Sequence, residues 1–476
     1  MPDLRRYAAA LLLAPAAGCQ LADPVAGRSA ELTAPGIDLV AIGSISGTRA
    51  DLSRQTAGAL ENGVAGNLLG GLGSGIDYAG FHLFVAVPDR GPNAVAFNPA
   101  SDDTASYINR VQTFFMDLAP AAPGGDLPFT LRPILVDTTL LGSLAPLHYG
   151  SGASVGLGDG TPALDRGRHT HHFTGRSDGF DPATPSTDAG NARLDPESVR
   201  LSGDDLRMFI SDEYGPHVYE FDTLTGVRVR SFTLPPELAV SAQSPRGDTE
   251  IAGNTVGRVA NKGMEGLALT PDGRTLVGAM QSPLIQDGGT SARFTRIVTI
   301  DLRSGQTHQF AYPLTNIGTA KKPKYPTVSE ILAINDHEFL VDERDGKGLG
   351  DDSAAAFKTV FHIDLDGAAE VTGVTGEANL AGAAVSKTLF VDLVALFTAH
   401  GIAAIDIPAK LEGITFGPDL TVDGQRRHTL WVANDNDFLG HIVDTNHPAG
   451  IDNPNQFFVL AVDPALVPGL VRLHAF

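Results

Sequence analysis

The chain has 476 residues, of which 42% are hydrophobic and 19% are charged, and its formal net charge is −21 at pH 7. This length can bury a large core in one to three domains. Because the charge is strongly negative and no run of Lys or Arg occurs, we exclude nucleic acid as a partner. The 54 glycines and 31 prolines favour an all-β protein with many turns. The acidic excess has two readings, either a solvated surface that keeps a secreted protein soluble or clusters that bind cations.

The N-terminal segment has the layout of a bacterial export signal. Arg5 and Arg6 precede the short apolar run 8–14, and small residues lead to Cys19, the one cysteine of the chain. This pattern resembles a lipoprotein signal, although Ala16 stands where that signal usually has Leu. We therefore interpret residues 1–19 as a lipoprotein-type signal peptide with lipidation at Cys19, and residues 20–36 as a tether. The alternative is ordinary secretion.

These features predict a protein of the bacterial cell envelope, either lipid-anchored or free in the periplasm or outside the cell. The apolar run is too short to span a bilayer as a stable helix. We expect a monomer that meets the membrane only through the lipid at Cys19.

A β-hairpin recurs along the rest of the chain. In 265–281, Leu267 and Leu269 alternate with other residues, Pro271-Asp272-Gly273 has the composition of a turn, and a second β-rich run follows. The opening glutamates of the copies are 68, 65 and 82 residues apart. The copies are Glu197–Glu213, Glu265–Gln281, Glu330–Asp345 and Glu412–Asp437.

A further strand that ends in Asp follows each hairpin, and the segment around Ser74 and Asp89 is a divergent fifth copy. Sequential meanders at a long period predict a single closed β-propeller of five or six blades over residues 37–476. Pairing of Asp38–Ile45 with Gln456–Val462 would close it. The alternative is an elongated two-domain β protein. We expect one helix, Val391–Ala399, because its apolar residues recur at period 3.6.

Residues 144–195 differ from the hairpins and contain little periodicity. They are rich in Gly, Asp, Thr and Pro, and they include His169, His171 and His172. We interpret them as an inserted loop over one face of the fold. The histidines have two readings, a solvated loop or a transition-metal site, but no second half of a zinc motif is evident.

The hairpins gather acidic residues on one face. In four copies a Glu stands at the start of the first strand, in the same position of the repeat, and acidic residues stand at the end of the second strand. Because a hairpin returns the chain to where it began, these acidic residues lie at the same end of the strands. Like charges held together destabilise a fold unless cations pair with them. Oxygen ligands suit Ca²⁺, which we predict as the cofactor, better than Mg²⁺. The expected metal ligands are Asp89, Glu197, Asp212, Glu213, Glu330, Asp342, Glu343 and Asp435. For any single acid, the alternative is a turn cap or a local ion pair.

Basic residues and one histidine lie beside the acidic motifs. Arg90, Lys262 and Arg344 are expected to bind substrate, and His217 is a candidate for acid/base chemistry because it follows a strand end near the acids. The chain contains no Gly-rich phosphate loop of the P-loop or dinucleotide type.

Five short motifs together resemble the bacterial phytase-like family, which is labelled "esterase-like activity of phytase". They are Ser74-Gly75-Ile76, Asp89-Arg90-Gly91-Pro92-Asn93, Ser211-Asp212-Glu213-Tyr214-Gly215-Pro216, Asn261-Lys262-Gly263-Met264-Glu265-Gly266-Leu267 and Leu411-Glu412-Gly413-Ile414. The resemblance runs from about Ile37 to the C-terminus. It implies a secreted β-propeller with recurrent Asp and Glu and a phosphoester or ester hydrolase activity. Two features depart from the family pattern, Glu197-Ser198 in place of an E-G pair and the large insertion.

Three functional hypotheses follow. The first is a metal-dependent hydrolase of small phosphoesters or other esters, with Glu265, Glu412 and His217 as catalytic residues. The second is a non-catalytic, calcium-stabilised propeller that binds a ligand or an envelope partner. The third is a lactonase-type propeller with one central ion held by Glu265, Asn434 and Asp435.

Overall fold

The structure is a computed structural model, and it describes residues 36–92, 98, 100–102, 105–152, 156–167 and 169–474. The predicted signal peptide, its lipidation site Cys19 and all of the predicted tether except Gly36 lie outside the described residues. Among the described helices, none has the length and apolar character needed to cross a membrane.

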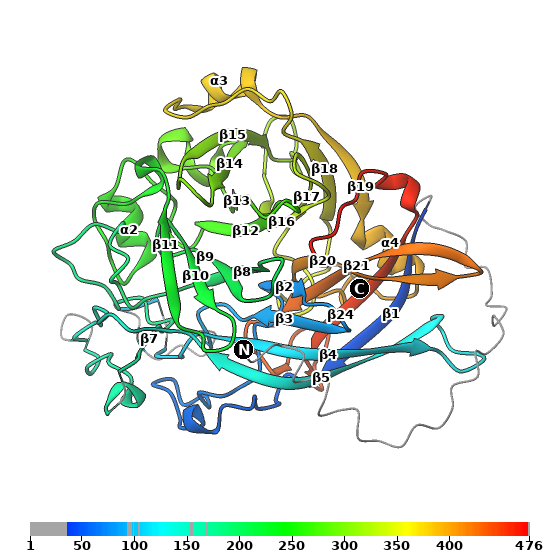
Figure 1. The fold of residues 1–476 in the computed structure, drawn as a ribbon, viewed down its shortest axis with the longest axis horizontal. Coiled ribbons are helices and arrows are strands. Elements are labelled where there is room, and N and C mark those ends of the chain that lie inside the picture. Colours follow the sequence, from blue (N-terminus) through cyan, green and yellow to red (C-terminus); the bar gives the residue numbers. More distant parts are fainter. Residues whose placement is uncertain are drawn as a thin grey trace.

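Five four-stranded antiparallel sheets form the blades of a propeller (Figure 1). The first blade is β2 (Gly75–Tyr78), β3 (Leu83–Val87), β4 (Arg110–Pro120) and β5 (Phe129–Leu140). The second is β8 (Pro196–Leu201), β9 (Arg207–Asp212), β10 (His217–Asp222) and β11 (Arg228–Thr233). The third is β12 (Met264–Leu269), β13 (Thr275–Met280), β14 (Phe294–Asp301) and β15 (Thr307–Pro313). The fourth is β16 (Thr327–Ala333), β17 (Glu338–Arg344), β18 (Lys358–Asp364) and β19 (Lys387–Asp392). The fifth is β20 (Lys410–Val422), β21 (Gln425–Asp435), β24 (Asn455–Val462) and β1 (Ile37–Ile45).

The remaining elements are short. Two-residue strands form two small sheets, β6 (Gly142–Ser143) with β7 (His171–His172) and β22 (His441–Ile442) with β23 (Ile451–Asp452). The α-helices are α2 (Gly247–Gly253), α3 (Glu377–Leu380) and α4 (Leu393–Ala399). Single 3-10 turns lie at Arg54–Thr56, Ala163–Asp165, Pro236–Leu238, Ile285–Asp287, Gly289–Ser291, Ala381–Ala383 and Pro464–Leu466.

The two ends of the chain close the ring within one blade. Strand β1 pairs antiparallel with β24, and the register runs from Ile37 opposite Val462 to Ile45 opposite Asn455. This pairing was predicted, but it completes the fifth blade and does not add a sixth. Around the centre each first strand contacts the next, in the order β2, β8, β12, β16, β20 and back to β2 (Figure 1).

The hairpin prediction is confirmed in the third blade. Strands β12 and β13 pair across the predicted turn, where Gly273 adopts φ +69°, a conformation that favours glycine. Helix α4 starts at Leu393, two residues later than expected, because Asp392 caps it by accepting a hydrogen bond from the Ala395 N–H at 2.9 Å. The short helices α2 and α3 were not expected.

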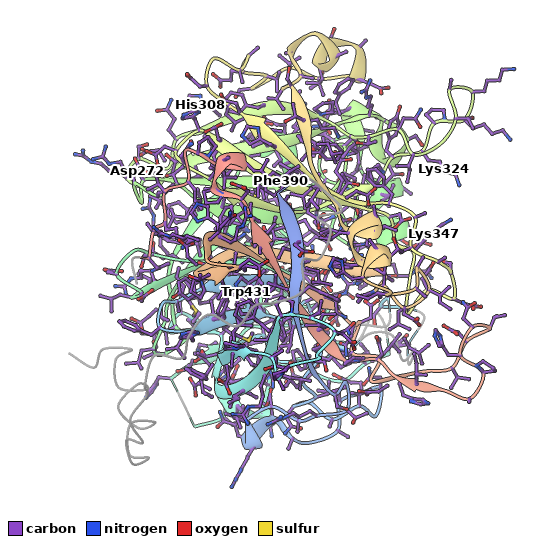
Figure 2. The ribbon with its side chains drawn as sticks, turned by 90° about the vertical axis from the view of Figure 1, so that its right-hand side faces the viewer. Asp272, His308, Lys324, Lys347, Phe390 and Trp431 are labelled. Carbon is purple, nitrogen blue, oxygen red and sulfur yellow. The ribbon has the colours of Figure 1, made fainter. Side chains whose placement is uncertain are left out.

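Apolar side chains fill the spaces between neighbouring blades. Between blades one and five, for example, Phe84 and Trp431 are both buried, with ring centroids 4.4 Å apart. Trp431 lies in the interior in Figure 2, which views the molecule from the side. In the same view Asp272, in the β12–β13 turn, and Lys347, which follows β17, lie on opposite faces of the ring.

The axis of the propeller is filled by the buried ion pair of Glu330 and Arg200, whose Nη2 lies 3.0 Å from Glu330 Oε2. The carboxylate also accepts hydrogen bonds at 2.8 Å from Ser198 Oγ and from the Leu267 N–H. The guanidinium donates to four main-chain carbonyls, those of Ile76, Val199, Ile331 and Ile414. Together these groups come from the first strands of all five blades. The pair therefore ties the blades to one another.

The C-terminal segment 467–474 crosses the end of the ring where the turns between first and second strands lie. Beneath it is a cavity of about 60 Å³ between the segment and the axial residues. The contacts of the C-terminal segment reach three blades. The Val471 N–H donates to Ile334 O at 2.8 Å, and Arg472 pairs with Asp419. His474 Nδ1 lies 3.2 Å from Asp205 Oδ1. This end of the propeller is therefore covered.

We expect Glu330→Gln to destabilise the fold by about 3–5 kcal/mol, because it leaves the Arg200 guanidinium buried without its partner charge. The control is Glu338→Gln in the same blade, whose partner His362 lies in a half-buried pair and which should cost less than about 1 kcal/mol. Urea unfolding measures both. Equal stability of the two variants would contradict the role given to the axial pair.

Candidate functional site

Three of the four opening glutamates sit in β-bulges at the start of the first strands. The ladder to the second strand is irregular where Glu197, Glu265 and Glu412 occur. A bulge adds one residue and redirects its side chain. In the fourth blade the irregular position is Ser329, and Glu330 pairs regularly with Asp342. The expectation that four glutamates share one phase is therefore wrong for Glu330, which points into the axis.

Glu265 and Glu412 are each followed by a glycine, which crowding at the centre explains. A Cβ on Gly266 would come within 2.6 Å of the Ile331 nitrogen, and a Cβ on Gly413 within 2.9 Å of the Gly73 carbonyl oxygen. The first strands thus approach one another too closely for larger side chains at this level. Ser198 is accommodated because its hydroxyl donates to Glu330.

Eight carboxylates gather at the end of the ring opposite the C-terminal segment, and we call them the carboxylate cluster. Seven are buried and Asp437 is half-buried. Four cationic side chains lie among them, so the ionised cluster has four more negative than positive charges. The acids are Asp89, Asp195, Glu197, Glu213, Glu265, Glu412, Asp435 and Asp437, and the cations are Arg90, Lys262, Arg344 and Lys410.

Two arginines bridge parts of the cluster. Arg90 Nη1 lies 2.5 Å from Asp195 Oδ2 and 3.7 Å from Glu213 Oε2. Arg344 Nη2 contacts Glu412 Oε1 and lies 3.9 Å from Glu265 Oε1. Each guanidinium therefore serves two carboxylates and does not neutralise both.

The two lysines differ in their surroundings. Lys410 Nζ lies 2.9 Å from Asp435 Oδ2 and also contacts Asp437. Lys262 Nζ donates instead to Gln281 Oε1 at 2.8 Å. Burial lowers the pKa of Lys262, although Glu213 and Glu265 oppose that shift. Lys262 is thus an ammonium group near the cluster that is not held in a close ion pair within the described residues.

Several carboxylate oxygens in the cluster lack a hydrogen-bond partner among the described residues. They are Glu213 Oε1, Glu265 Oε2 and Glu412 Oε2, all buried. The Glu197 carboxylate likewise has neither a hydrogen bond nor an ion pair in the part of the chain that the structure describes.

Burial, reinforced by the neighbouring Glu265, raises the pKa of Glu197 well above its usual value. Burial and Asp195 raise the pKa of Glu213 to about 7. Unsatisfied buried oxygens of this kind fit a bound cation.

Two groups of three carboxylates are compact enough to hold a metal ion, since their oxygens lie within 4.8 Å of one another. Asp89, Asp435 and Asp437 form one group, but the Lys410 ammonium already contacts two of them. The other group is Asp195, Glu197 and Glu213. Only this second group includes the unpaired Glu197, so it fits a cation better.

Two predicted residues of the second blade lie outside this arrangement. Asp212 Oδ1 accepts hydrogen bonds from the Tyr214 and Asp195 N–H groups at 3.1 and 3.2 Å, which shapes the loop after β9. His217 Nε2 lies 3.2 Å from Thr187 O, and its ring stacks on Tyr219 with centroids 5.2 Å apart. Burial lowers the pKa of His217 to about 4. The geometry gives His217 a packing role away from the cluster.

The two predicted ligands of the fourth blade differ. Glu343 accepts a hydrogen bond from Tyr312 OH at 2.7 Å and pairs with Lys387, neither of which belongs to the cluster. Asp342 is fully buried, and both of its carboxylate oxygens lack a hydrogen-bond partner among the described residues. Burial raises the pKa of Asp342, with Glu412 of the cluster adding to the shift and Lys358 and Arg344 opposing it. Neither carboxylate lies in the two compact groups.

The single-ion lactonase arrangement is not supported by the geometry. Asn434 Oδ1 accepts a hydrogen bond from the Gln456 N–H at 2.5 Å, and its amide nitrogen donates to Pro454 O at 3.3 Å. Asp435 is paired with Lys410. One of the three loop histidines already has a protein partner, because His172 Nδ1 lies 2.8 Å from Asp165 Oδ1.

The sequence interpretation missed two members of the cluster, Asp195 and Lys410. Each lies two residues before an opening glutamate, Glu197 or Glu412. Side chains two positions apart on an extended strand share a face, so this spacing could have identified them. Asp195 is the last residue of the predicted insertion, which thus contributes directly to the site.

Comparison with known proteins identifies a family. A family model described as "Phytase-like: Esterase-like activity of phytase" matches residues 67–438. An "Uncharacterized secreted protein" of Arthroderma benhamiae is 29% identical over 329 residues, which are 59% of this chain and 60% of that protein. The chain thus covers less than two thirds of that relative.

Solved propellers are more distant. The β-propeller domain of Cps50 (Swd1) from Myceliophteria thermophila has 9% identity and a TM-score of 0.22, with 50% of this chain and 51% of that chain covered. The periplasmic gluconolactonase PpgL of Pseudomonas aeruginosa has 12% identity and a TM-score of 0.31, with 81% and 88% covered. Similarity at this level does not extend to function.

The family model spans blades one to four and strands β20 and β21 of the fifth, together with every member of the carboxylate cluster. The resemblance seen in the sequence motifs is thereby confirmed, and the chain belongs to the phytase-like family described as "Esterase-like activity of phytase".

Proposed function

We propose that this protein is a metal-dependent hydrolase of phosphoesters or other esters, with its reaction centre at the carboxylate cluster. The observation that carries the proposal is the set of buried carboxylates, in excess over the cations among them, whose free oxygens lie at the end of the ring opposite the C-terminal segment. Such a cluster fits a divalent cation. We propose Ca²⁺, held by Asp195, Glu197 and Glu213.

The proposal assigns separate tasks to the other side chains. A bound divalent ion would supply positive charge for substrate oxygens and lower the pKa of a water molecule. Arg90, Lys262 and Arg344 would orient the substrate's oxygens. Glu265 and Glu412, each with one unpaired oxygen, would accept a proton from the attacking water.

A non-catalytic propeller with structural calcium is the second candidate. Such a protein needs a closed site in which every ligand oxygen and every cation is satisfied. Here Lys262, within the described residues, makes its close contact with the Gln281 amide and not with a carboxylate, so one cation of the cluster is available to a substrate. This arrangement favours the hydrolase.

We also propose that the protein is exported to the cell envelope or beyond. The secreted relative and the basic and apolar pattern before Cys19 support export. Lipid attachment at Cys19 is part of the proposal.

Calcium should raise the melting temperature by several degrees, and the rise should be larger at pH 8 than at pH 5. Buried carboxyls such as Glu213 have raised pKa values, so the metal-free fold holds more protons than the unfolded chain between about pH 4.5 and 7. Its stability therefore falls as the pH rises through that interval. A cation that replaces these protons stabilises the fold most where they are lost. If the melting temperature is the same with and without calcium at both pH values, the metal site is contradicted.

Glu265→Gln and Glu412→Gln should each reduce the hydrolysis of an aryl phosphate or aryl ester in calcium by about tenfold to a thousandfold. Gln preserves the shape of the side chain but cannot accept the proton, which is worth a few kcal/mol in the transition state. Steady-state kinetics on purified protein checks this.

The matched controls are Glu343→Gln and His217→Gln. Both residues are buried, but they contact Tyr312 and Thr187 and not the cluster. Activity per folded molecule should stay within about threefold of the wild type. If the controls lose as much activity as the cluster variants, or no ester is hydrolysed by the wild type, the reaction centre is not where we place it.

A further inference from the structure

The second strand of each blade ends beside acidic residues, except in the third blade. In the other four blades, acids stand at or near the ends of β3, β9, β17 and β21, namely Asp89, Asp212, Asp342 and Asp435. Strand β13 of the third blade is followed instead by Gln281, which is buried. The third blade thus places a neutral amide where the other blades place carboxylates.

The main chain of Gln281 is held on both sides. Its N–H donates to Gly263 O at 2.8 Å, and its carbonyl accepts a hydrogen bond from the Val328 N–H at 3.0 Å. Gly263 directly precedes β12, and Val328 belongs to β16 of the fourth blade. The amide therefore extends from a fixed position between two first strands.

The Gln281 amide serves a cation and an acid of the carboxylate cluster at the same time. Its Oε1 accepts a hydrogen bond from Lys262 Nζ at 2.8 Å. Burial is the main cause of the raised pKa of Glu265, and a hydrogen bond from the Gln281 side chain opposes that rise. An amide can make both contacts because its oxygen accepts while its nitrogen donates. It carries no charge, so it holds Lys262 without neutralising it.

Lys262 is presented to the cluster by a tight turn. Its N–H donates to Val259 O at 3.1 Å, and Asn261 adopts φ +56°, a left-handed conformation that Asn tolerates better than most residues. The Lys262 side chain is half-buried, and burial lowers its pKa. The charged groups that face it from the surrounding elements are Glu213, Glu265, Arg344 and Lys410.

The fifth blade contains the charged version of this arrangement. Lys410 and Lys262 each lie two or three residues before an opening glutamate. Lys410 Nζ, however, lies 2.9 Å from a carboxylate oxygen of Asp435, at the end of the second strand. Gln281 takes the part of Asp435 in the third blade, so one lysine of the cluster is neutralised at close range and the other is not.

We propose that Gln281 is a positioning residue of the reaction centre, whose neutral amide holds Lys262 as a charged ammonium group available to the phosphoryl oxygens of a substrate. The inference rests on the proposed function for the identity of the substrate, but not for the state of Lys262. It predicts that any preference for phosphoesters over uncharged esters depends on this amide.

Gln281→Glu tests the proposal because it preserves the shape of the side chain and adds the carboxylate found in the fifth blade. Gln281→Met removes both hydrogen bonds without adding a charge, and it serves if the Glu variant folds poorly. The matched control is Gln309→Glu in β15 of the same blade. The Gln309 amide also joins a cation and an acid, Arg296 Nη1 at 3.0 Å and Glu237 Oε1 at 2.5 Å, but none of these residues belongs to the cluster.

Acetylation of lysines by acetic anhydride, in chelator at pH 8, reports the state of Lys262 without turnover. Peptide mass spectrometry gives its rate relative to Lys324, which is exposed (Figure 2). We expect Gln281→Glu to lower this relative rate about tenfold, because a carboxylate beside Lys262 stabilises the unreactive ammonium form. Gln309→Glu should match the wild type. An unchanged rate in Gln281→Glu, or an equal fall in Gln309→Glu, would overturn the role of Gln281.

Kinetics separates this inference from the proposed function. The KM of an aryl phosphate should rise about tenfold in Gln281→Glu and about threefold in Gln281→Met, whereas that of an uncharged aryl ester should change by less than about twofold. Slower acetylation in a protein that hydrolyses nothing would support the role of Gln281 and remove the hydrolase. Hydrolysis with the same KM change for both substrates would support the hydrolase and remove the role of Gln281.

Discussion

The ion pair of Glu330 and Arg200 on the propeller axis is the contact on which the arrangement of the blades depends. Its hydrogen bonds reach the first strand of every blade, so the five sheets share one anchor. A charge pair so deeply buried stabilises a fold only when all of its polar groups are nearly satisfied. The pair also specifies how the blades are spaced, because a different spacing would separate the two charges and leave one of them buried without its partner. The same pair fills the axis, and the carboxylate cluster lies at the end of the ring that the C-terminal segment does not cover.

The carboxylate cluster is a consequence of how the strands begin. Bulges redirect Glu197, Glu265 and Glu412 to a common end, and small residues after them let the strands meet. The cluster keeps a negative excess because its guanidinium groups are each shared between two acids. Buried like charges oppose folding in the absence of a cation, and that cost is what makes the cluster suited to binding one.

Much of the fold could be predicted from the sequence because it depends on local patterns. Period-two alternation, turn residues and the recurring glutamate indicated the hairpins, their common end and the closure by both chain ends. The phase of Glu330 was misjudged because one residue of register decides which way a strand side chain points. His217 was misplaced because its partner, the Thr187 carbonyl, belongs to an insertion whose path no local pattern fixes. Asp195 was missed because it was assigned to that insertion, although its spacing of two residues from Glu197 is a local signal that places both side chains on one face.

We propose that a divalent cation binds the carboxylate cluster at Asp195, Glu197 and Glu213. Crystals grown in calcium, or soaked with terbium, would give anomalous difference density at any bound ion. We predict one strong peak within about 2.3–2.6 Å of oxygens from these three carboxylates. Density only at other acidic positions, or none at the cluster while Arg90 and Lys410 keep their contacts, would contradict the account.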